Sequence, residues 1–226
     1  MQIDYHLLSK NNLFKNIAVT NIPKVLNCLG CFKKVYAKNE IIFSANDPIC
    51  HAGIILKGLV DINQASIDGN YNLINQVLPG ELFGEALACS SNNHHLLEIT
   101  ASAYTEILFI GIPKISSPGS CQCPYRLIVL ENLLLIIANQ NVYLNKKIQL
   151  VTEKSLRNKL CLYFSHLSKE QLSTTINLPF RREKLAHYLS ADRSAISREL
   201  MRMEKDGLIQ VTRNQISLLY MLSPPN

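Results

Sequence analysis

Residues 185–200 read LAHYLSADRSAISREL, and this stretch decides the architecture of the C-terminal third of the chain. Apolar residues recur in it at helical spacing, and Ser-Ala-Asp at 190–192 interrupts the pattern before it resumes. Asp192 is a favourable residue to begin a helix, because its side-chain oxygen accepts hydrogen bonds from free backbone N–H groups. We therefore expect a helix over 182–189, a three-residue turn and a second helix over 193–206.

The second of these helices carries short polar and basic residues on its exposed first turns. The first turns of a recognition helix enter the major groove of DNA, where arginine can bond guanine O6 and N7 together. A hairpin built on 208–211 and 215–219 follows, in the place where a wing touches phosphates. An amphipathic helix pair with a solvated basic face is the alternative interpretation. The predicted DNA contacts are Arg193, Ser194, Ser197, Arg198, Arg202 and Arg213.

The basic charge of the chain is concentrated in the same region. The formal net charge is +6, from 23 Lys and Arg against 17 Asp and Glu. Residues 1–150 hold 11 basic and 10 acidic residues, whereas residues 151–226 hold 12 and 7. A near-neutral part followed by a basic part indicates that only the C-terminal part meets a polyanion.

The composition is that of a folded globular protein. Of the 226 residues, 47% are hydrophobic and 18% charged, which excludes a disordered chain. No uninterrupted apolar run reaches the roughly 18 residues of a membrane span, since Glu131 and Asn132 break the densest stretch. No secretion signal is readable at the N-terminus, so we expect a cytoplasmic protein without a membrane partner. Seven cysteines, an odd number, indicate reduced thiols rather than a disulfide framework.

The middle of the chain has the sequence pattern of an antiparallel β-roll, with short apolar or alternating runs separated by turn signals. A short helical segment over 4–30 comes first, and a linker rich in Pro, Ser, Gly and Cys over 112–124 comes last. Asp68-Gly69-Asn70 is the clearest hairpin turn, because these residues tolerate positive φ. Evenly spaced short strands of this kind are typical of a sandwich or roll. The predicted strands are 33–36, 41–43, 53–62, 73–77, 99–103 and 106–110.

A long helix follows the linker and carries an unbroken heptad seam. The seam residues are spaced alternately three and four apart, which is typical of a helix that pairs with a second copy. The polar Asn141 occupies an a-type position, where a buried Asn can fix the register of a parallel pair. Packing on the chain's own sheet is the alternative. The predicted dimer interface is Leu127, Leu130, Leu134, Ile137, Asn141, Leu144 and Ile148, with Val151 ending the seam.

Two stretches of this sequence resemble the Crp/Fnr family of bacterial transcription regulators. They are GELFGE at 80–85 and the stretch at 185–200 described above, and the resemblance extends from about Phe14 to Tyr220. It implies a homodimer that binds a palindromic promoter site and contacts RNA polymerase. It also places Arg193, Ser194, Ser197 and Arg198 at the family's base-contacting positions.

The sequence departs from the cyclic-nucleotide-binding members of that family at one place. Those members hold the cyclic phosphate with an Arg-Ser pair, and an ungapped count from Gly84-Glu85 puts His95 and Leu96 there. A neutral His offers one donor and Leu offers none, so the resemblance implies an effector other than cyclic AMP. The predicted effector pocket comprises Phe83, Gly84, Glu85, His94, His95 and Thr100.

Three kinds of signal stay open for the sensor. The first is a small organic ligand in this pocket. The second is a metal, haem or iron–sulfur site, because Cys28/Cys31 and Cys121/Cys123 have chelating spacings. The third is a thiol switch at the second of these pairs. Ordinary unreactive cysteines are the simpler interpretation of both pairs, and no cofactor is assigned.

The sequence as a whole predicts an α+β protein and not an enzyme. It contains no nucleophile elbow, phosphate-binding loop or His-Glu-x-x-His motif. The predicted order is an antiparallel, jelly-roll-like sensor domain over 1–124, a dimerisation helix over 125–152 and a winged helix-turn-helix over 153–226. Double-stranded DNA, RNA polymerase, a second copy of the chain and an unknown small effector are the expected partners.

Overall fold

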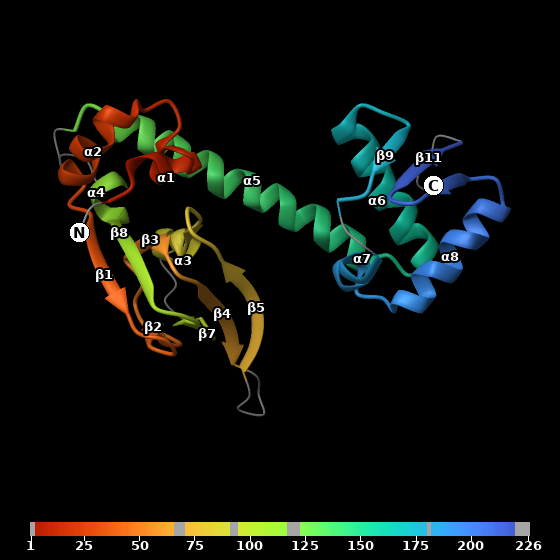
Figure 1. Ribbon diagram of the computed structural model, residues 1–226, viewed down its shortest axis with the longest axis horizontal. Helices are drawn as coiled ribbons and strands as arrows, with labels where there is room; N and C mark the ends of the chain where they lie inside the picture. Colours follow the sequence, from red (N-terminus) through yellow and green to blue (C-terminus); the bar gives the residue numbers. More distant parts are fainter. Residues whose placement is uncertain (1–2, 66–70, 91–94, 117–122, 180–181, 220–226) are drawn as a thin grey trace. The chain divides into compact units, whose positions relative to one another are not determined.

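The computed structural model describes residues 3–65, 71–90, 95–116, 123–179 and 182–219. The chain divides into two compact units, Met1–Gln140 and Asn141–Asn226 (Figure 1). The first holds the N-terminal helices, two sheets and the first half of a long helix; the second holds the rest. The predicted antiparallel sensor, long helix and C-terminal helix-turn-helix are therefore confirmed as the order of the chain.

Two four-stranded antiparallel sheets form the roll of the first unit. One has the order β1-β8-β3-β6 and the other β2-β7-β4-β5. The bounds of the strands are β1 Phe32–Tyr36, β2 Ile41–Phe43, β3 His51–Lys57, β4 Val60–Ala65, β5 Tyr71–Val77, β6 Leu82–Phe83, β7 Leu97–Ala101 and β8 Thr105–Gly111.

The sequence interpretation of 53–62 as one strand is wrong, because the chain turns back in its middle. Gly58 has φ +96°, and a Cβ at this position would lie 2.4 Å from the Tyr104 carbonyl oxygen. Only glycine combines this backbone conformation with so close an approach. The run is therefore split into β3 and β4, which belong to different sheets. The predicted turn at 68–70 lies outside the described residues.

The sheet that contains β3 and β8 is covered on both faces. Side chains alternate between faces along a strand, so Ile55 and Ile107 point into the roll while Ile54 and Leu108 point outward. The outward residues pack against the N-terminal helices, a short helix that follows β8 and the start of the long helix. These helices are α1 Tyr5–Ser9, α2 Ile22–Cys28, α4 Ile112–Ser116 and α5 Arg126–Thr152, with short 3₁₀ turns at Asn12–Phe14 and Val19–Asn21.

Helix α5 is fastened to the N-terminal segment by a buried amide. The Asn132 Nδ2 donates to the carbonyl oxygens of Leu13 at 3.0 Å and Lys15 at 2.8 Å. The polar Asn132 in an apolar stretch of sequence is thus explained by two backbone carbonyls that would otherwise lack a partner.

The predicted linker before α5 is partly helical, since α4 occupies its first residues.

By length and composition only, α5 is apolar enough to cross a membrane, which differs from the sequence expectation. The expectation counted uninterrupted apolar runs, whereas α5 accumulates apolar residues around isolated polar ones. Of its most apolar 18-residue window, 17% is buried. Such a single helix is weak evidence of a membrane span. Apolar side chains of α5, among them Leu127 and Leu134, are exposed within the single chain.

The second unit packs the end of the long helix, three further helices and a small sheet around one core. Helix α6 (Leu156–Gln171) contributes Leu160 and Phe164, both fully buried. Helices α7 (Arg182–Leu189) and α8 (Arg193–Lys205) cover one side of this core. The antiparallel sheet has the order β10-β11-β9, with β9 Thr175–Asn177, β10 Ile209–Thr212 and β11 Gln215–Leu218.

Candidate functional site

Helices α7 and α8 form the predicted helix-turn-helix. Leu189 of α7 and Ile196 of α8 are fully buried in the same core. The turn between them closes through Ser190, which adopts φ +50°, and through the Ala191 N–H, which donates to the Ala186 carbonyl at 3.0 Å. Asp192 is the residue that precedes α8, but its side chain makes no capping hydrogen bond. The position of the cap was predicted correctly and its hydrogen bond was not.

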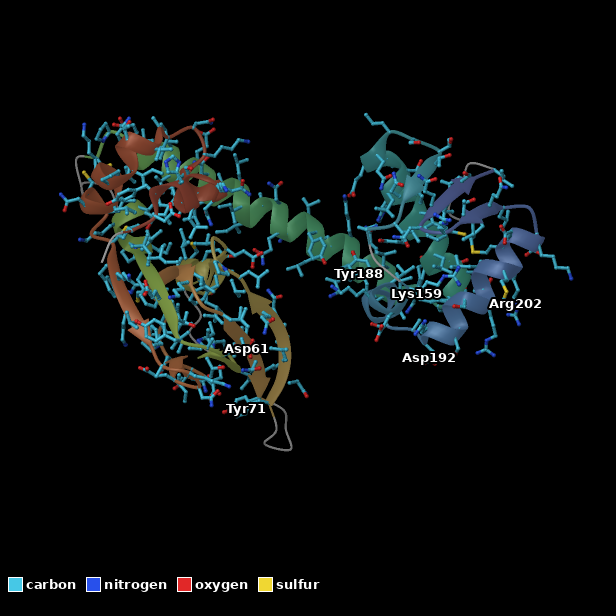
Figure 2. The ribbon with its side chains drawn as sticks, viewed as in Figure 1. Asp61, Tyr71, Lys159, Tyr188, Asp192 and Arg202 are labelled. Atoms are coloured by element: carbon cyan, nitrogen blue, oxygen red, sulfur yellow. The ribbon has the colours of Figure 1, made fainter. Side chains whose placement is uncertain are left out.

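The outer face of α8 presents the predicted contact residues to solvent. Arg193, Ser194 and Arg198 are exposed, and Ser197 is half-buried. The Arg198 Nε reaches the Ser194 carbonyl at 3.4 Å, a long bond that leaves the rest of the guanidinium free to bind elsewhere. Arg202 lies further along α8 with 71% of its side chain exposed (Figure 2). These residues form one polar and basic surface, which we call the α8 face.

Arg182 is a residue of this surface that sequence reasoning missed. It stands at the first position of α7, and its Nη1 lies 3.5 Å from the Ser197 Oγ of α8. A contact between residues fifteen apart follows from the packing of the two helices and carries no local sequence signal.

Two basic residues of α6 fix the helix pair in place. The Arg157 Nε lies 2.6 Å from Glu199 Oε1 of α8, and its Nη1 lies 2.7 Å from Asp206 Oδ2 beyond the end of that helix. The Lys159 Nζ donates to the Leu189 carbonyl at the end of α7, at 3.2 Å (Figure 2). We call the contacts of Arg157 the α6–α8 clamp. It holds α8 at its middle and just beyond its C-terminal end, which fixes the orientation of the α8 face.

The predicted hairpin after α8 is part of a three-stranded sheet. Strand β9, which precedes α7, adds to the predicted hairpin by pairing Ile176 with Ile216. Sequence reasoning missed it because a three-residue strand in a polar stretch has almost no periodicity. Arg213 lies at the exposed turn between β10 and β11 with φ +51°. A guanidinium on such a tip is placed to contact a phosphate backbone.

The first unit holds a cavity of about 560 Å³ beside α3 (Glu85–Cys89). Three of the predicted effector residues line it: Phe83, Gly84 and Glu85. Strands β4, β5 and β7 supply apolar walls, the N-terminal segment contributes Lys10 to Asn12, and α5 contributes Ile136 and Gln140. Sequence reasoning missed the contributions from outside α3 and β6, because these segments are distant in the chain.

Two predicted effector residues lie away from this cavity, and a third lies outside the described residues. His95 is buried, with its Nε2 3.0 Å from the Asp47 carbonyl oxygen, and it does not line the cavity. Thr100, on β7, is 3.3 Å from the Asn63 Nδ2 through its Oγ1 and is also not among the lining residues. His94 belongs to the part of the chain that is not described. The ungapped count from Gly84 therefore does not locate cavity residues beyond α3.

The predicted seam of α5 is divided between two environments. Leu130 and Ile137 are partly buried against the core of their own unit. Leu127, Leu134 and Ile148 are 71%, 66% and 56% exposed. Leu130 and Ile137, the d-type seam positions in the first half of α5, therefore pack against the sensor itself, where β3 and β8 have an apolar outer face. The remaining seam residues Asn141 and Leu144 are exposed, as are the neighbours Leu135, Val142 and Tyr143.

The described cysteines are not gathered at one site. Among described residues, no three or more His, Cys, Asp or Glu side chains are placed to hold a metal. Burial raises the pKa of the Cys31 thiol to about 12, while Cys28 is exposed and Cys123 is buried. Cys121 is outside the described residues, so the predicted 121/123 pair is not described as a pair.

Comparison with known proteins identifies both parts of the chain. Residues 33–116 match the family model of the cyclic nucleotide-binding domain. Residues 158–221 match that of the Crp-like helix-turn-helix domain. A search of curated protein sequences gave no match.

Solved structures share the fold over nearly the whole chain. The catabolite activator protein of Thermus thermophilus is 19% identical, with a TM-score of 0.54, and the match covers 94% of this chain and 95% of that one. A variant of CprK complexed with OCPA is 15% identical, with a TM-score of 0.55 and coverages of 88% and 90%. A putative cAMP-binding regulatory protein of Silicibacter pomeroyi DSS-3 is 16% identical, with a TM-score of 0.50 and coverages of 98% and 96%.

Proposed function

Because this chain carries both domains of the Crp/Fnr family and belongs to it, we propose that it acts as a homodimer on a palindromic promoter site under the control of a small effector. Proteins of this family are DNA-binding transcription regulators with a sensor domain and are not enzymes. The observation that carries the proposal is the α8 face, which lies on a helix held by the α6–α8 clamp and whose exposed residues match the composition of a recognition helix.

The DNA contacts are proposed residue by residue. Arg193, Ser194, Ser197 and Arg198 are assigned to base edges and nearby phosphates, and Arg202 extends the same face. Arg213 at the tip of the hairpin is assigned to a phosphate. These residues come from two elements, α8 and the β10–β11 turn, which would meet neighbouring parts of one half-site.

The dimer is proposed to form through the exposed apolar residues of the α5 seam, Leu127, Leu134, Leu144 and Ile148, which we call the exposed stripe of α5. Apolar side chains at largely exposed positions along one helix are costly to leave in water, and a second copy of the helix would cover them. Asn141 interrupts this stripe, and its Oδ1 accepts from the Asn145 Nδ2 at 2.8 Å. Two recognition helices brought together in this way would read half-sites about one helical turn apart.

Helix α5 also offers a physical route for control. It contributes Ile136 and Gln140 to the sensor cavity. In the second unit its last turns contact α6 through Lys146 and Glu170, at 2.8 Å, and α7 through Lys147, whose Nζ lies 5.8 Å from the Tyr188 ring. An effector that changes the packing of α5 around Ile136 and Gln140 would shift the two α5 helices of the dimer against each other. This shift would change the population of dimers that can bind DNA.

The remaining partners are proposals of the same kind. We propose that the protein is cytoplasmic, as its family membership implies. We also propose that it contacts RNA polymerase when bound at a promoter. The exposed stripe of α5 is assigned to the partner protomer and not to a lipid bilayer.

The direct test is selection of duplex DNA by the full-length protein. Rounds of binding to a random duplex library should enrich an inverted repeat, and anisotropy titrations on that site should weaken steeply with salt. Enrichment of an asymmetric motif would contradict the palindrome. Binding that is independent of sequence at all salt concentrations would contradict a specific regulator.

A further inference from the structure

The cavity of the first unit pairs an apolar wall with polar side chains, among them the amides of Asn11, Asn12, Asn75 and Gln140, and carries little positive charge. The apolar wall is formed by Ile62, Val77, Leu97 and Ile99 of the sheet, with Phe83 of β6 and Ile136 of α5. At about 560 Å³ it is within the range of small-molecule sites, which usually pair apolar walls with a few polar groups.

Among the described residues, the charged groups that line the cavity are one lysine and two glutamates. Lys10 is exposed, so water screens its charge. Glu81 is also exposed, and its Oε2 accepts from the Leu78 N–H at 2.9 Å. Glu85 is different, because it is only 6% exposed and burial raises its pKa. The interior of the cavity therefore faces a carboxyl group, with its cation at the rim.

The sequence around the cavity reinforces this charge distribution. Between Lys57 and Lys114 there is no Lys or Arg, while six Asp or Glu occur in the same 56 residues. This stretch includes β4, β5, α3 and β7, which build most of the cavity. An anionic ligand placed there would meet a buried carboxyl group and, among the described residues that line the cavity, no buried cation to pair with, which is unfavourable for the ligand and for the carboxyl group.

We infer that the cavity takes a non-anionic organic molecule with an apolar body and one hydrogen-bond donor, an amine or a hydroxyl, directed at Glu85. The inference rests on the proposed function, since it names the chemical class of the effector. Binding energy would come from burying the apolar body against the wall described above. Selectivity would come from the carboxyl group, which rejects phosphates, sulfonates and carboxylates.

A matched pair of fluorescent probes tests this charge selectivity. N-phenyl-1-naphthylamine has an apolar body and one N–H donor, and 1-anilinonaphthalene-8-sulfonate is the same skeleton with an added sulfonate. Titration of the full-length protein should give saturable one-to-one binding of the neutral probe. The sulfonate should bind the same site at least tenfold more weakly. Equal or tighter binding of the sulfonate at that site would overturn the inference.

Three variants connect the result to the cavity. Ala86→Trp, at an exposed lining position of α3, should abolish saturable binding of the neutral probe by filling the space. Glu85→Gln should reduce the preference for the neutral probe at least threefold, whereas Glu183→Gln, an exposed acid of α7, should leave it unchanged. Neutral-probe binding that survives Ala86→Trp, or a preference unaffected by Glu85→Gln, would contradict the assignment.

Failure of this inference is distinguishable from failure of the proposed function. Anisotropy on the selected DNA site is measured with the same protein preparation. If DNA binding is specific and the neutral probe does not bind the cavity, the ligand class is wrong and the regulator stands. If the probe binds as expected but no specific DNA site is enriched, the regulator is wrong and the cavity assignment loses its role as an effector site.

Discussion

Arg198 and Arg213 are expected to make different kinds of contact with DNA. Arg198 lies on the α8 face and Arg213 at the hairpin tip. Arg198→Ala should cost about 1–3 kcal/mol of binding free energy and relax the preference for one base in each half-site. Arg213→Ala should weaken binding to all sequences alike and reduce the slope of log affinity against log salt by about one per protomer.

Anisotropy titrations on the selected site and its single-base variants measure both effects. Lys169→Ala, which removes a basic residue of α6 outside the helix-turn-helix, is the control and should change the affinity little. An equal loss on every sequence for Arg198→Ala would show that this residue contacts only phosphate.

Glu85 makes a second prediction, on pH and stability. Burial raises the pKa of its carboxyl group above the ordinary value, so the folded protein holds this proton when the unfolded chain has already released it. Stability is therefore unaffected below about pH 4 and falls as the pH rises towards the raised pKa, above which the loss is constant. Glu85→Gln removes this loss, because the amide cannot ionise.

Thermal unfolding should show the Glu85→Gln variant melting higher than the parent protein at pH 7, with the difference shrinking towards zero near pH 4. Each kcal/mol corresponds to roughly 2–4 °C in a protein of this size. Glu131→Gln, at an exposed position of α5, should leave the melting temperature unchanged at both pH values. A variant that gains as much at pH 4 as at pH 7 would mean that packing, not ionisation, distinguishes the two side chains.

Single residues were predictable where the signal is local. The α8 face followed from helical spacing, because residues three and four apart share one side of a helix. The cavity did not, since its walls come from β4, β7 and α5 as well as from the turn before α3. His95 illustrates the limit: its distance along the chain from Gly84 says nothing about the backbone carbonyl of Asp47 that it contacts.

At the scale of elements, the α6–α8 clamp should determine how well α8 is held. Arg157→Ala leaves Glu199, whose side chain is 12% exposed, without this partner. Because Arg157 itself is partly solvated, the expected loss of unfolding free energy is about 1 kcal/mol. Affinity for DNA should fall on all sequences together, since the clamp positions the helix and contacts no base.

Lys146→Ala provides the matched control for the clamp. It removes the exposed α5–α6 ion pair with Glu170, whose partners are 40% and 56% exposed, and should change stability less. Chemical denaturation and anisotropy measure the two consequences. Altered base preference in the Arg157→Ala variant would contradict a purely positioning role.

Elements with strong periodicity were predictable and short ones were not. The bounds of α7 agree with the prediction, and α8 ends one residue earlier than expected. Strand β9 and the break between β3 and β4 were missed, because a three-residue strand and a tight turn depend on partners elsewhere in the sheet. In α5 the seam was visible, but the part of it that packs on its own unit could not be known without the outer faces of β3 and β8.

For the whole molecule, the decisive question is whether the exposed stripe of α5 joins two chains. Leu134→Asp with Ile148→Asp puts two charges on positions that are 66% and 56% exposed, so each chain should still fold. Sedimentation should then show a monomer where the parent protein is a dimer. Affinity for the inverted repeat should fall by roughly 10²–10⁴, to that of a single half-site, because the second recognition helix is no longer tethered. Asn139→Asp, on another face of α5, should preserve both the dimer and its affinity. A double variant that remains dimeric would place the interface elsewhere and leave the stripe unexplained.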